Sequence, residues 1–494
     1  MQALRTFMGI CDVCLADVPA ALEREGDDVY CAKYCPTHGT RRWLVSRNGD
    51  RYLRFDRQYH TLFPADEPPS AGGEPYFLIT NRCNQGCNYC AFEPNRYDYF
   101  GDYDVEQFDR DMRSSRSSKI DLFGGEPLMH PRFFEFVERI AAAGKTTVIL
   151  SNGMGFADEG VVLRLMEASR GRCFVRITFE GFEDENYGHL PVRRLIDVKL
   201  AALANLKKHA VPMALSHTVN LEEQRDEDRL RRTIRAIIEF AMKERFVGGV
   251  SFNPITAVGA SRSNRPDEVL SVDRLMDQLL AACPVAIERK HVYLTQQIAL
   301  YIGRILNVPM CENKQAAMLF RRGGRWVGIN DLFDCERLER RFDRRIEQPR
   351  VGRFRQLLGL VADLAASARL SRLPWLAGLA ARTLPLLWSG LDYRRLPKEI
   401  LPVKTGTCCD PNNFDASAAR WCEKGSYVQS GTRMKTGLCS HLAIEALRER
   451  TAADHPRNGN EAAAAKAISL EPDKAPAGSA LAGPPPGRPS SLQG

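Results

Sequence analysis

Between about residues 75 and 258, short apolar runs alternate with longer stretches in which apolar residues recur every three or four positions. The short runs predict buried strands and the longer stretches predict amphipathic helices. The strands are expected at residues 76–80, 118–123, 145–151, 174–179, 212–219 and 247–255, and the helices at Val105–Arg116, Arg132–Ala143, Val161–Ser169, Arg194–His209 and Arg229–Lys243. Six such units predict an α/β fold with a parallel sheet, arranged as a partial (β/α)6 barrel.

The regions on either side of this barrel have different patterns. Residues 1–50 hold two close pairs of cysteines and little apolar periodicity, so we expect a small metal-binding module there. The barrel is expected within residues 70–262, and residues 263–450, which are mainly helical in pattern and rich in cysteine, are expected to form a second domain. Residues 451–494 are rich in Ala, Pro, Gly and Ser, a composition that predicts disorder.

Composition narrows the classes of function. The 69 basic and 61 acidic side chains are interspersed along the chain, so the net charge of +8 is weak evidence for nucleic acid, and no nucleic-acid partner is expected. The first ten residues lack an apolar export segment, which favours a cytoplasmic location. Because cytosolic thiols are kept reduced, metal ligation explains the fifteen cysteines better than disulfides do.

Three cysteines follow the first predicted strand. Cys83, Cys87 and Cys90 lie in NRCNQGCNYC, at the carboxyl end of a strand, where parallel α/β folds place their chemistry. Three thiolates on one loop can bind three irons of a cubane cluster and leave the fourth iron open to a ligand. Taken alone, the same pattern also fits part of a zinc site.

A second motif, FGGEP, follows the second predicted strand. Gly124 and Gly125 have no side chains, so backbone carbonyls there can approach a ligand ammonium group closely, and Glu126 can supply a carboxylate. Pro127 fixes the direction in which the chain leaves the motif. The alternative interpretation, an ordinary turn, has to treat the position of FGGEP after the next strand as an accident.

Together the two motifs resemble those of the radical S-adenosylmethionine (radical SAM) superfamily over roughly residues 75–260. The family signature CxxxCxΦC, in which Φ is aromatic, is matched by Cys83, Cys87, Tyr89 and Cys90, and its GGEP-type motif by residues 124–127. The resemblance implies a [4Fe–4S] cluster whose open iron binds S-adenosylmethionine, with Tyr89 packed against the adenine.

The resemblance also implies roles for residues at later strand ends. Ser151 and Asn152 follow the third strand, where the family places polar groups near the ribose and the methionine carboxylate. Thr178, Glu180 and His217 end the next two strands and are expected to bind cofactor or to line the substrate cavity. No catalytic residue is assigned. The implied reaction is reductive cleavage of S-adenosylmethionine to a 5′-deoxyadenosyl radical, with a small donor such as ferredoxin or flavodoxin supplying the electron.

The amino-terminal module carries its own candidate site. Cys11 and Cys14 in CDVC, with Cys31 and Cys35 in CAKYC, have the spacing of a tetrahedral metal site that suits zinc or a mononuclear iron. A structural zinc site with no redox role is the alternative, and His38 is expected to be a turn residue rather than a ligand. The run CDVCLADVPA with CPTHG resembles the amino terminus of the branch that includes tetraether lipid synthase and archaeal-type pterin methylases.

The carboxyl-terminal cysteines predict further iron–sulfur chemistry. In radical SAM relatives this region often holds auxiliary [4Fe–4S] clusters, for which the candidate ligands here are Cys311, Cys335, Cys408, Cys409, Cys422 and Cys439. Cys173 and Cys283 adjoin apolar segments and are expected in the core.

An apolar stretch, Leu357–Trp388, follows eight arginines in Arg337–Arg355. Charged residues and prolines interrupt it, so it is too broken to span a bilayer. A basic, tryptophan-bearing pair of helices predicts peripheral membrane contact, and ordinary packing on the barrel is the alternative.

These observations predict a radical SAM enzyme that abstracts hydrogen from a large apolar substrate such as a lipid chain, forming a C–C bond. The enzymatic alternatives are a peptide maturase and a methylase of a small heterocycle. The non-enzymatic alternative is a zinc protein that binds nucleic acid.

Overall fold

The three-dimensional structure is a computed structural model of the chain. The residues described are 3–64, 66–67, 74–91, 93, 101–192, 194–261, 268–307, 311, 313–347, 352–388, 398–407, 415 and 424–427. Four of the predicted cluster ligands, Cys408, Cys409, Cys422 and Cys439, and the predicted disordered tail at 451–494 lie outside the described residues.

Four antiparallel strands form the amino-terminal module. They are β1 (Ala3–Ile10), β2 (Asp17–Glu25), β3 (Asp28–Cys35) and β4 (Gly39–Ser46), and they pair in chain order. Leu22, Val29 and Trp43 pack against one another, with Leu53 of the following helix α1 (Gly49–Leu62) against them. The short apolar faces of these strands therefore close a small core of their own.

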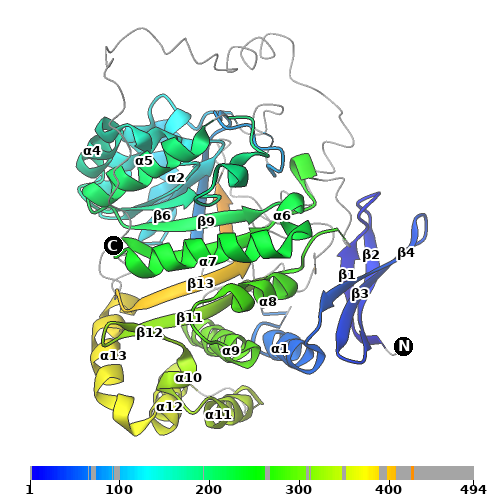
Figure 1. The fold of residues 1–494 in the computed structure, drawn as a ribbon. Helices are drawn as coiled ribbons and strands as arrows, with labels where there is room; N and C mark the ends of the chain where they lie inside the picture. The colour runs from blue at the N-terminus through cyan, green and yellow to red at the C-terminus, as the bar shows by residue number, and fades with distance from the viewer. Residues whose placement is uncertain are drawn as a thin grey trace. The chain divides into compact units, whose positions relative to one another are not determined.

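The second sheet contains all six predicted strands. They are β5 (Glu74–Thr80), β6 (Lys119–Gly124), β7 (Thr146–Ser151), β8 (Cys173–Thr178), β9 (Met213–Val219) and β10 (Val247–Pro254). Each lies parallel to the next in chain order. The helices between them are α2 (Val105–Ser114), α3 (Phe133–Ala142), α4 (Glu159–Ala168), α5 (Leu195–Lys208), the short α6 (Leu221–Arg225) and α7 (Glu227–Lys243) (Figure 1). The predicted α/β class is confirmed, and the unbroken strand order is that of a barrel wall rather than a doubly wound sheet.

These helices cover one face of the sheet. Alternate strand residues such as Leu122, Ile149 and Val175 belong to the same buried cluster as Phe108 of α2 and Ile234 of α7. Side chains alternate between the two faces of a strand, so the intervening residues lie on the opposite face, which we call the inner face. Each fully buried large apolar side chain contributes about 1.5–3 kcal/mol, so this core holds the strand ends in place.

Strands that follow the predicted boundary at residues 262/263 extend the sheet of the barrel. The strand β13 (Ile400–Gly406) pairs in parallel with β10, and β11 (Lys314–Arg322) and β12 (Arg325–Val327) extend the same sheet in antiparallel fashion. At the other edge, β14 (Lys424–Tyr427) pairs with β5. The strand β11 reads KQAAMLFRR, whose alanines and arginines give a weak strand pattern, and this explains why the sequence pattern did not indicate a strand there.

Helices nevertheless dominate this region, as expected. They are α8 (Val272–Ala282), α9 (Arg289–Leu306), α10 (Ile329–Leu332), α11 (Cys335–Glu347), α12 (Arg353–Ser367) and α13 (Leu373–Trp388). Residues of α9, α11 and α12 share a buried cluster with Phe55, Tyr59 and Leu62 of α1. None of the helices in the described part of the chain is long and apolar enough to cross a membrane.

A buried polar cluster joins the amino-terminal module to these helices. Asp273 of α8 accepts hydrogen bonds from Ser46 Oγ at 2.5 Å, Tyr293 OH at 2.7 Å and Gln315 Nε2 at 2.8 Å, and it pairs with Arg289 at 2.6 Å. Ser46 ends β4, so charge-assisted hydrogen bonds connect the module directly to the helices behind the sheet.

Candidate active site and metal centre

The predicted cluster ligands lie on one loop at the carboxyl end of β5. We call residues 81–91 the three-cysteine loop, because it carries Cys83, Cys87 and Cys90, all of them partly exposed. Cys90 packs beside Tyr76 and Leu78 on the inner face of the sheet, and its carbonyl accepts a hydrogen bond from Ala260 N at 3.0 Å. The loop is therefore held both by the strand before it and by the segment that follows β10.

The chemistry of these thiols fits a cationic cluster. Burial, helped by the nearby Glu126 and Cys90, raises the pKa of the Cys83 thiol to about 11. Burial raises the pKa of the Cys87 thiol as well, with Cys90 and Cys83 next in effect. Because neighbouring thiolates on this loop raise one another's pKa, all three can be ionised together only beside compensating positive charge, which the irons of a [4Fe–4S] cluster would supply. The donor set present therefore fits such a cluster.

Gly124 and Gly125 make a close backbone contact with this loop. Gly124 has a φ of +133°, and a Cβ on it would lie 2.3 Å from the carbonyl oxygen of Thr80. A Cβ on Gly125 would lie 2.1 Å from the carbonyl oxygen of Arg82. The two glycines thus let the end of β6 approach the start of the three-cysteine loop, a role that is separate from the ligand contact predicted for them.

Glu126 lies beside Ser151 and Asn152. The carboxylate is almost completely buried and accepts hydrogen bonds from Ser151 Oγ at 2.8 Å, Asn152 N at 2.6 Å and Leu128 N at 3.3 Å. Burial raises the pKa of Glu126 to about 7, against the lowering effect of these hydrogen bonds. Pro127 begins the single turn η1 (Pro127–Met129), which Glu126 caps.

Asn152 connects this group to the three-cysteine loop. Its Nδ2 donates to Asn84 Oδ1 at 2.7 Å, and Asn84 follows Cys83 directly. The ends of β6 and β7 are therefore tied to the loop that carries the cysteines. Three of the predicted cofactor residues, Glu126, Ser151 and Asn152, therefore belong to one hydrogen-bonded group that reaches the loop.

Lys199 is a buried cation in this group that the sequence analysis missed. Its Nζ donates to the carbonyl oxygens of Asn152 and Thr178, the latter at 2.7 Å, and the residue is fully buried. Burial lowers the pKa of Lys199. The negative charges of Glu180, Cys87 and Glu126 act in the opposite direction and raise this pKa. A lysine in register with the apolar residues Leu195, Ala202 and Leu206 of α5 was the signal that could have found it.

Tyr89 lies on the other side of the same loop. Its hydroxyl donates to Glu180 Oε1 at 3.0 Å, and its ring packs against His189 with the centroids 5.5 Å apart. Of the three residues expected to bind cofactor or line the cavity, Glu180 and His217 are buried to within about 1% of completely, and Thr178 is partly exposed.

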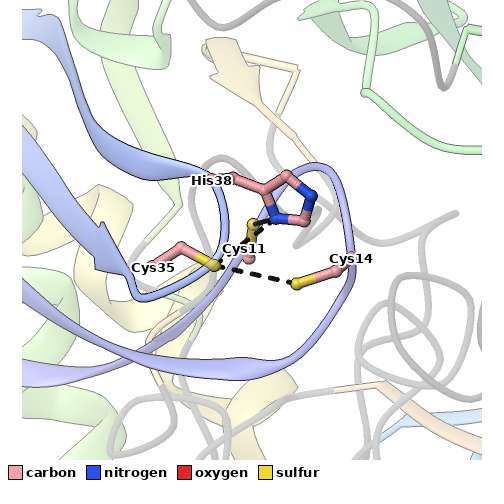
Figure 2. Close-up of side chains that lie close together, drawn as sticks. All are labelled: Cys11, Cys14, Cys35 and His38. Carbon is pink, nitrogen blue, oxygen red and sulfur yellow. Dashed lines mark hydrogen bonds between the residues drawn. The ribbon is translucent and has the colours of Figure 1, made fainter.

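The amino-terminal module contains a compact group of potential metal ligands. Within the described part of the chain, one set of three or more such side chains has all its ligand atoms within 4.8 Å of one another: Cys11, Cys14, Cys35 and His38 (Figure 2). The Sγ atoms of Cys14 and Cys35 are 3.8 Å apart, and His38 Nδ1 lies 3.6 Å from Cys11 Sγ and 3.5 Å from Cys35 Sγ. We call these four residues the Cys3His group.

This geometry corrects the predicted set of four cysteines. Cys31 packs with Leu22, Val29 and Trp43, and burial raises the pKa of its thiol to about 11. Cys31 and Cys35 both lie in β3, and four residues of extended strand span about 13 Å, too far for one ion. His38 follows Cys35 through the turn into β4 and reaches the group instead.

The Cys35 thiol is well suited to bind a metal. Although burial opposes ionisation, hydrogen bonds from the His38 and Thr37 backbone and from the His38 side chain lower the pKa of Cys35 to about 6. A thiolate is the form that binds zinc or iron, and a Cys3His set is a common structural zinc site.

The remaining described cysteines do not form a second group. Cys173 and Cys283 lie in the main core, as predicted. Cys335 begins α11 and packs against the cluster formed by the helices behind the sheet, and Cys311 is partly exposed before β11. The auxiliary clusters stay a prediction, since the four other candidate ligands lie outside the described residues.

Two protein families match this chain. Residues 77–234 match the radical SAM superfamily, and residues 3–47 match the HMPTM N-terminal zinc ribbon domain. The first match runs from β5 into α7, and the second covers the four strands that carry the Cys3His group.

Curated relatives are similar over parts of the chain. The 7,8-dihydro-6-hydroxymethylpterin dimethyltransferase of Methanocaldococcus jannaschii is 22% identical over 276 residues, which are 51% of this chain and 53% of that protein. The tungsten-containing aldehyde ferredoxin oxidoreductase cofactor-modifying protein of Pyrococcus furiosus is 36% identical over 89 residues, which are 17% of this chain and 25% of that protein. The chain thus spans about half the length of the first relative, and less of the second.

Solved structures with similar folds include SuiB of Streptococcus suis bound to its precursor peptide SuiA. That structure has a TM-score of 0.33 and 11% identity, over 44% of this chain and 45% of that chain. Methylornithine synthase has a TM-score of 0.30 and 14% identity, over 41% of this chain and 58% of that chain.

Proposed function

We propose that this chain, whose residues 77–234 match the radical SAM superfamily, is an enzyme of this superfamily and that its substrate is a small polar heterocycle. Enzymes of the superfamily use a [4Fe–4S] cluster and S-adenosylmethionine. When bound, this pair supplies a 5′-deoxyadenosyl radical that abstracts hydrogen from the substrate. The enzymatic assignment replaces the non-enzymatic alternative of a zinc protein that binds nucleic acid.

The residues already described have clear places in this proposal. Cys83, Cys87 and Cys90 would hold the cluster, and Tyr89 would lie against the adenine. The group of Glu126, Ser151 and Asn152 lies beside the loop and would receive the methionine end of the cofactor. Because Glu126 already accepts three hydrogen bonds from the protein, it also holds Ser151 and Asn152 in position.

One observation carries the substrate class: the inner face of the sheet changes from apolar to polar across its strands. Beside β5, Leu78, Phe123 and Leu150 form an apolar patch with Cys90. Strand register continues this row to Arg176 of β8, and the next row joins Thr178, Ser216 and Ser251. The half of the inner face towards β10 therefore presents hydroxyl, amide and guanidinium groups.

These polar groups are organised by hydrogen bonds. Ser251 Oγ donates to Asn253 Oδ1 at 2.9 Å, and Asn253 Nδ2 donates to Ser216 Oγ at 3.0 Å. All three side chains are partly exposed, so they keep the capacity to bind a ligand. An acyl or isoprenoid chain would desolvate these groups without compensation, whereas the edge of a heterocycle can pair with them. The pterin in the name of the Methanocaldococcus jannaschii relative is a compound of this kind.

The proposal is tested with anaerobically reconstituted enzyme, S-adenosylmethionine and a chemical reductant. Formation of 5′-deoxyadenosine is measured without substrate and with 7,8-dihydro-6-hydroxymethylpterin, a peptide or an acyl lipid. We expect the pterin to raise the rate and Asn253→Leu to raise its half-saturating concentration about tenfold. The same amide-to-leucine change at Gln278, which pairs with Arg231 on α7, is the matched control and should have no effect. A rate raised by lipid or peptide and not by pterin would contradict the proposal.

The lipid substrate predicted from the sequence is a second candidate, because one surface favours membrane contact. On α12, Phe354, Leu358 and Val361 lie on one face and are 73%, 54% and 50% exposed. The neighbouring Arg353 and Arg355 are exposed as well, and Asp363, the acidic residue of this helix, is buried against Arg341 and Arg345. An apolar face flanked by exposed arginines is typical of a helix that lies on an anionic membrane.

Sedimentation with vesicles tests this second candidate. Wild type should pellet with anionic vesicles at low salt and much less at high salt, because the attraction is screened within about 10 Å at 0.1 M salt. A Phe354→Ser/Leu358→Ser variant should lose binding, whereas Leu163→Ser, which alters an exposed leucine on α4, should retain it. Equal pelleting with and without lipid would remove this candidate. A cytoplasmic location and reduction by ferredoxin or flavodoxin remain part of the proposal.

A further inference from the structure

His217 lies between two buried glutamates. Its Nδ1 is 3.1 Å from Glu180 Oε2 and its Nε2 is 3.2 Å from Glu223 Oε2, and each of the three residues is at most 1% exposed. Burial alone would lower the pKa of His217, but Glu223 and Glu180 raise it to about 10. The side chain is therefore an imidazolium at neutral pH, with one carboxylate on each ring nitrogen.

The contacts continue from Glu180 to the three-cysteine loop. The second carboxylate oxygen of Glu180 accepts a hydrogen bond from the hydroxyl of Tyr89 at 3.0 Å. Both oxygens of Glu180 are thus used by the protein, one by His217 and one by Tyr89. Glu180 follows β8 and His217 belongs to β9, so two strand ends converge on the tyrosine of the loop.

A second path returns from Glu223 to the same tyrosine. Asn220 caps α6 through its Oδ1, and its Nδ2 lies 3.2 Å from both Glu223 Oε2 and His189 Nδ1. The His189 ring packs against the Tyr89 ring with centroids 5.5 Å apart. These six residues, Tyr89, Glu180, His217, Glu223, Asn220 and His189, close a ring of contacts that we call the Tyr89 network.

The imidazolium is what makes this arrangement stable. Without it, two carboxylates would face each other in a buried site, where unpaired charges are costly. Glu180 would then become protonated or move away, and in either case the acceptor of the Tyr89 hydroxyl would change. Tyr89 lies between Cys87 and Cys90, so its orientation is coupled to that of both sulfur atoms.

We propose that His217 is a positioning residue for the radical SAM reaction, which acts through Glu180 to fix Tyr89 and the three-cysteine loop. This inference rests on the proposed function, since it assumes that Tyr89 lies against the cofactor. It assigns His217 no contact with cofactor or substrate. The cofactor affinity then depends on a side chain that is separated from the cofactor by Glu180, its ion-pair partner, and by Tyr89.

The experiment compares wild type with His217→Gln, Tyr89→Phe and the double variant. Three quantities are measured: iron and sulfide content, the dissociation constant of S-adenosylmethionine, and the change in the electron paramagnetic resonance spectrum of the reduced cluster when the cofactor is added. We expect each single variant to keep its iron and to bind the cofactor about tenfold more weakly, with an altered spectral change. The double variant should be no weaker than the single ones, because both substitutions break the same connection.

A second histidine provides the matched control. His209 pairs with Glu159 at 2.6 Å near the protein surface, and His209→Gln should leave affinity and spectrum unchanged. If His217→Gln lowers only the unfolding temperature, or if Tyr89→Phe has no effect, or if the two effects add fully, the inference is overturned. Should His217→Gln fail to fold, Tyr89→Phe, which removes a single oxygen, decides alone. Wild type that does not bind S-adenosylmethionine would instead overturn the proposed function.

Discussion

The chain holds two cysteine sites that are built in opposite ways. In the Cys3His group, two hairpin turns of an antiparallel sheet bring four ligand atoms within 4.8 Å of one another. In the three-cysteine loop, all the cysteines come from one segment at the edge of a parallel sheet. Buried charged residues such as Glu126, Lys199 and Glu180 lie beside this loop.

This difference explains why one site suits a structural metal and the other a catalytic cofactor. Four converging donors complete a tetrahedral shell and leave no position for a substrate. Three cysteines on one loop leave one iron of a cubane open, and the groups around the loop can then select what binds there. Rigid turns are sufficient for the first site, whereas the second needs the network of hydrogen bonds that ties the loop to β6, β7 and β8.

The largest effect should come from removing the cysteines of the three-cysteine loop while keeping the Cys3His group. Replacing Cys83, Cys87 and Cys90 with alanine should abolish 5′-deoxyadenosine formation, because the site of electron transfer is lost. Metal in the Cys3His group should be retained, since its ligands belong to a different sheet. Metal analysis and an activity assay on the same preparation check both expectations.

The same variant tests for auxiliary clusters. If the carboxyl-terminal cysteines bind a second [4Fe–4S] cluster, wild type should contain about eight irons per chain besides any in the Cys3His group, and the triple variant should retain iron–sulfur absorbance. Iron near four in wild type, falling to the amount in the Cys3His group in the variant, would exclude an auxiliary cluster.

The Cys3His group should lose its metal when a turn residue is changed and keep its metal when a strand residue is changed. His38→Ala should lower metal content well below one per module and lower the unfolding temperature, because structural zinc stabilises small modules directly. Cys31→Ala, the control, should retain metal and lose only about 1 kcal/mol of unfolding free energy. Metal loss in Cys31→Ala with normal content in His38→Ala would restore the set of four cysteines.

The contrast between the two sites also shows what could be read from the sequence. The six strands were predictable because each is a short apolar run beside an amphipathic helix. Cys83, Cys87, Cys90 and Gly124–Pro127 could be proposed as site residues because each of the two motifs is local in the chain. The choice between Cys31 and His38 could not be made from the sequence, since it depends on where β3 ends and the turn begins. Residues contributed by helices, such as Lys199 and Glu223, carry no local motif and gain their roles only through packing.

A smaller effect is expected from Glu126→Ala. The carboxylate would face the methionine ammonium, and hydrogen bonds to charged groups contribute about 1.5–3 kcal/mol, so affinity for S-adenosylmethionine should fall about ten- to a hundredfold. Iron content should stay normal, because Glu126 bonds to Ser151, Asn152 and Leu128 rather than to the cysteines. Calorimetry with iron analysis is the measurement, and unchanged affinity would remove Glu126 from the cofactor site.

The smallest effect on catalysis should come from Lys199→Met. This variant tests whether the buried charges beside the three-cysteine loop contribute more to folding stability than to cofactor binding. Methionine fills a similar volume but leaves the carbonyls of Asn152 and Thr178 without their donor, and an unsatisfied buried acceptor costs about 1–3 kcal/mol of unfolding free energy. Lys207→Met, which removes a surface pair with Glu244, should cost less than about 0.5 kcal/mol. Because Lys199 bonds to the backbone at two strand ends, the reconstituted variant should retain most of its affinity for S-adenosylmethionine. A loss of affinity as large as that of Glu126→Ala, with normal stability, would show that the ammonium acts on the cofactor directly.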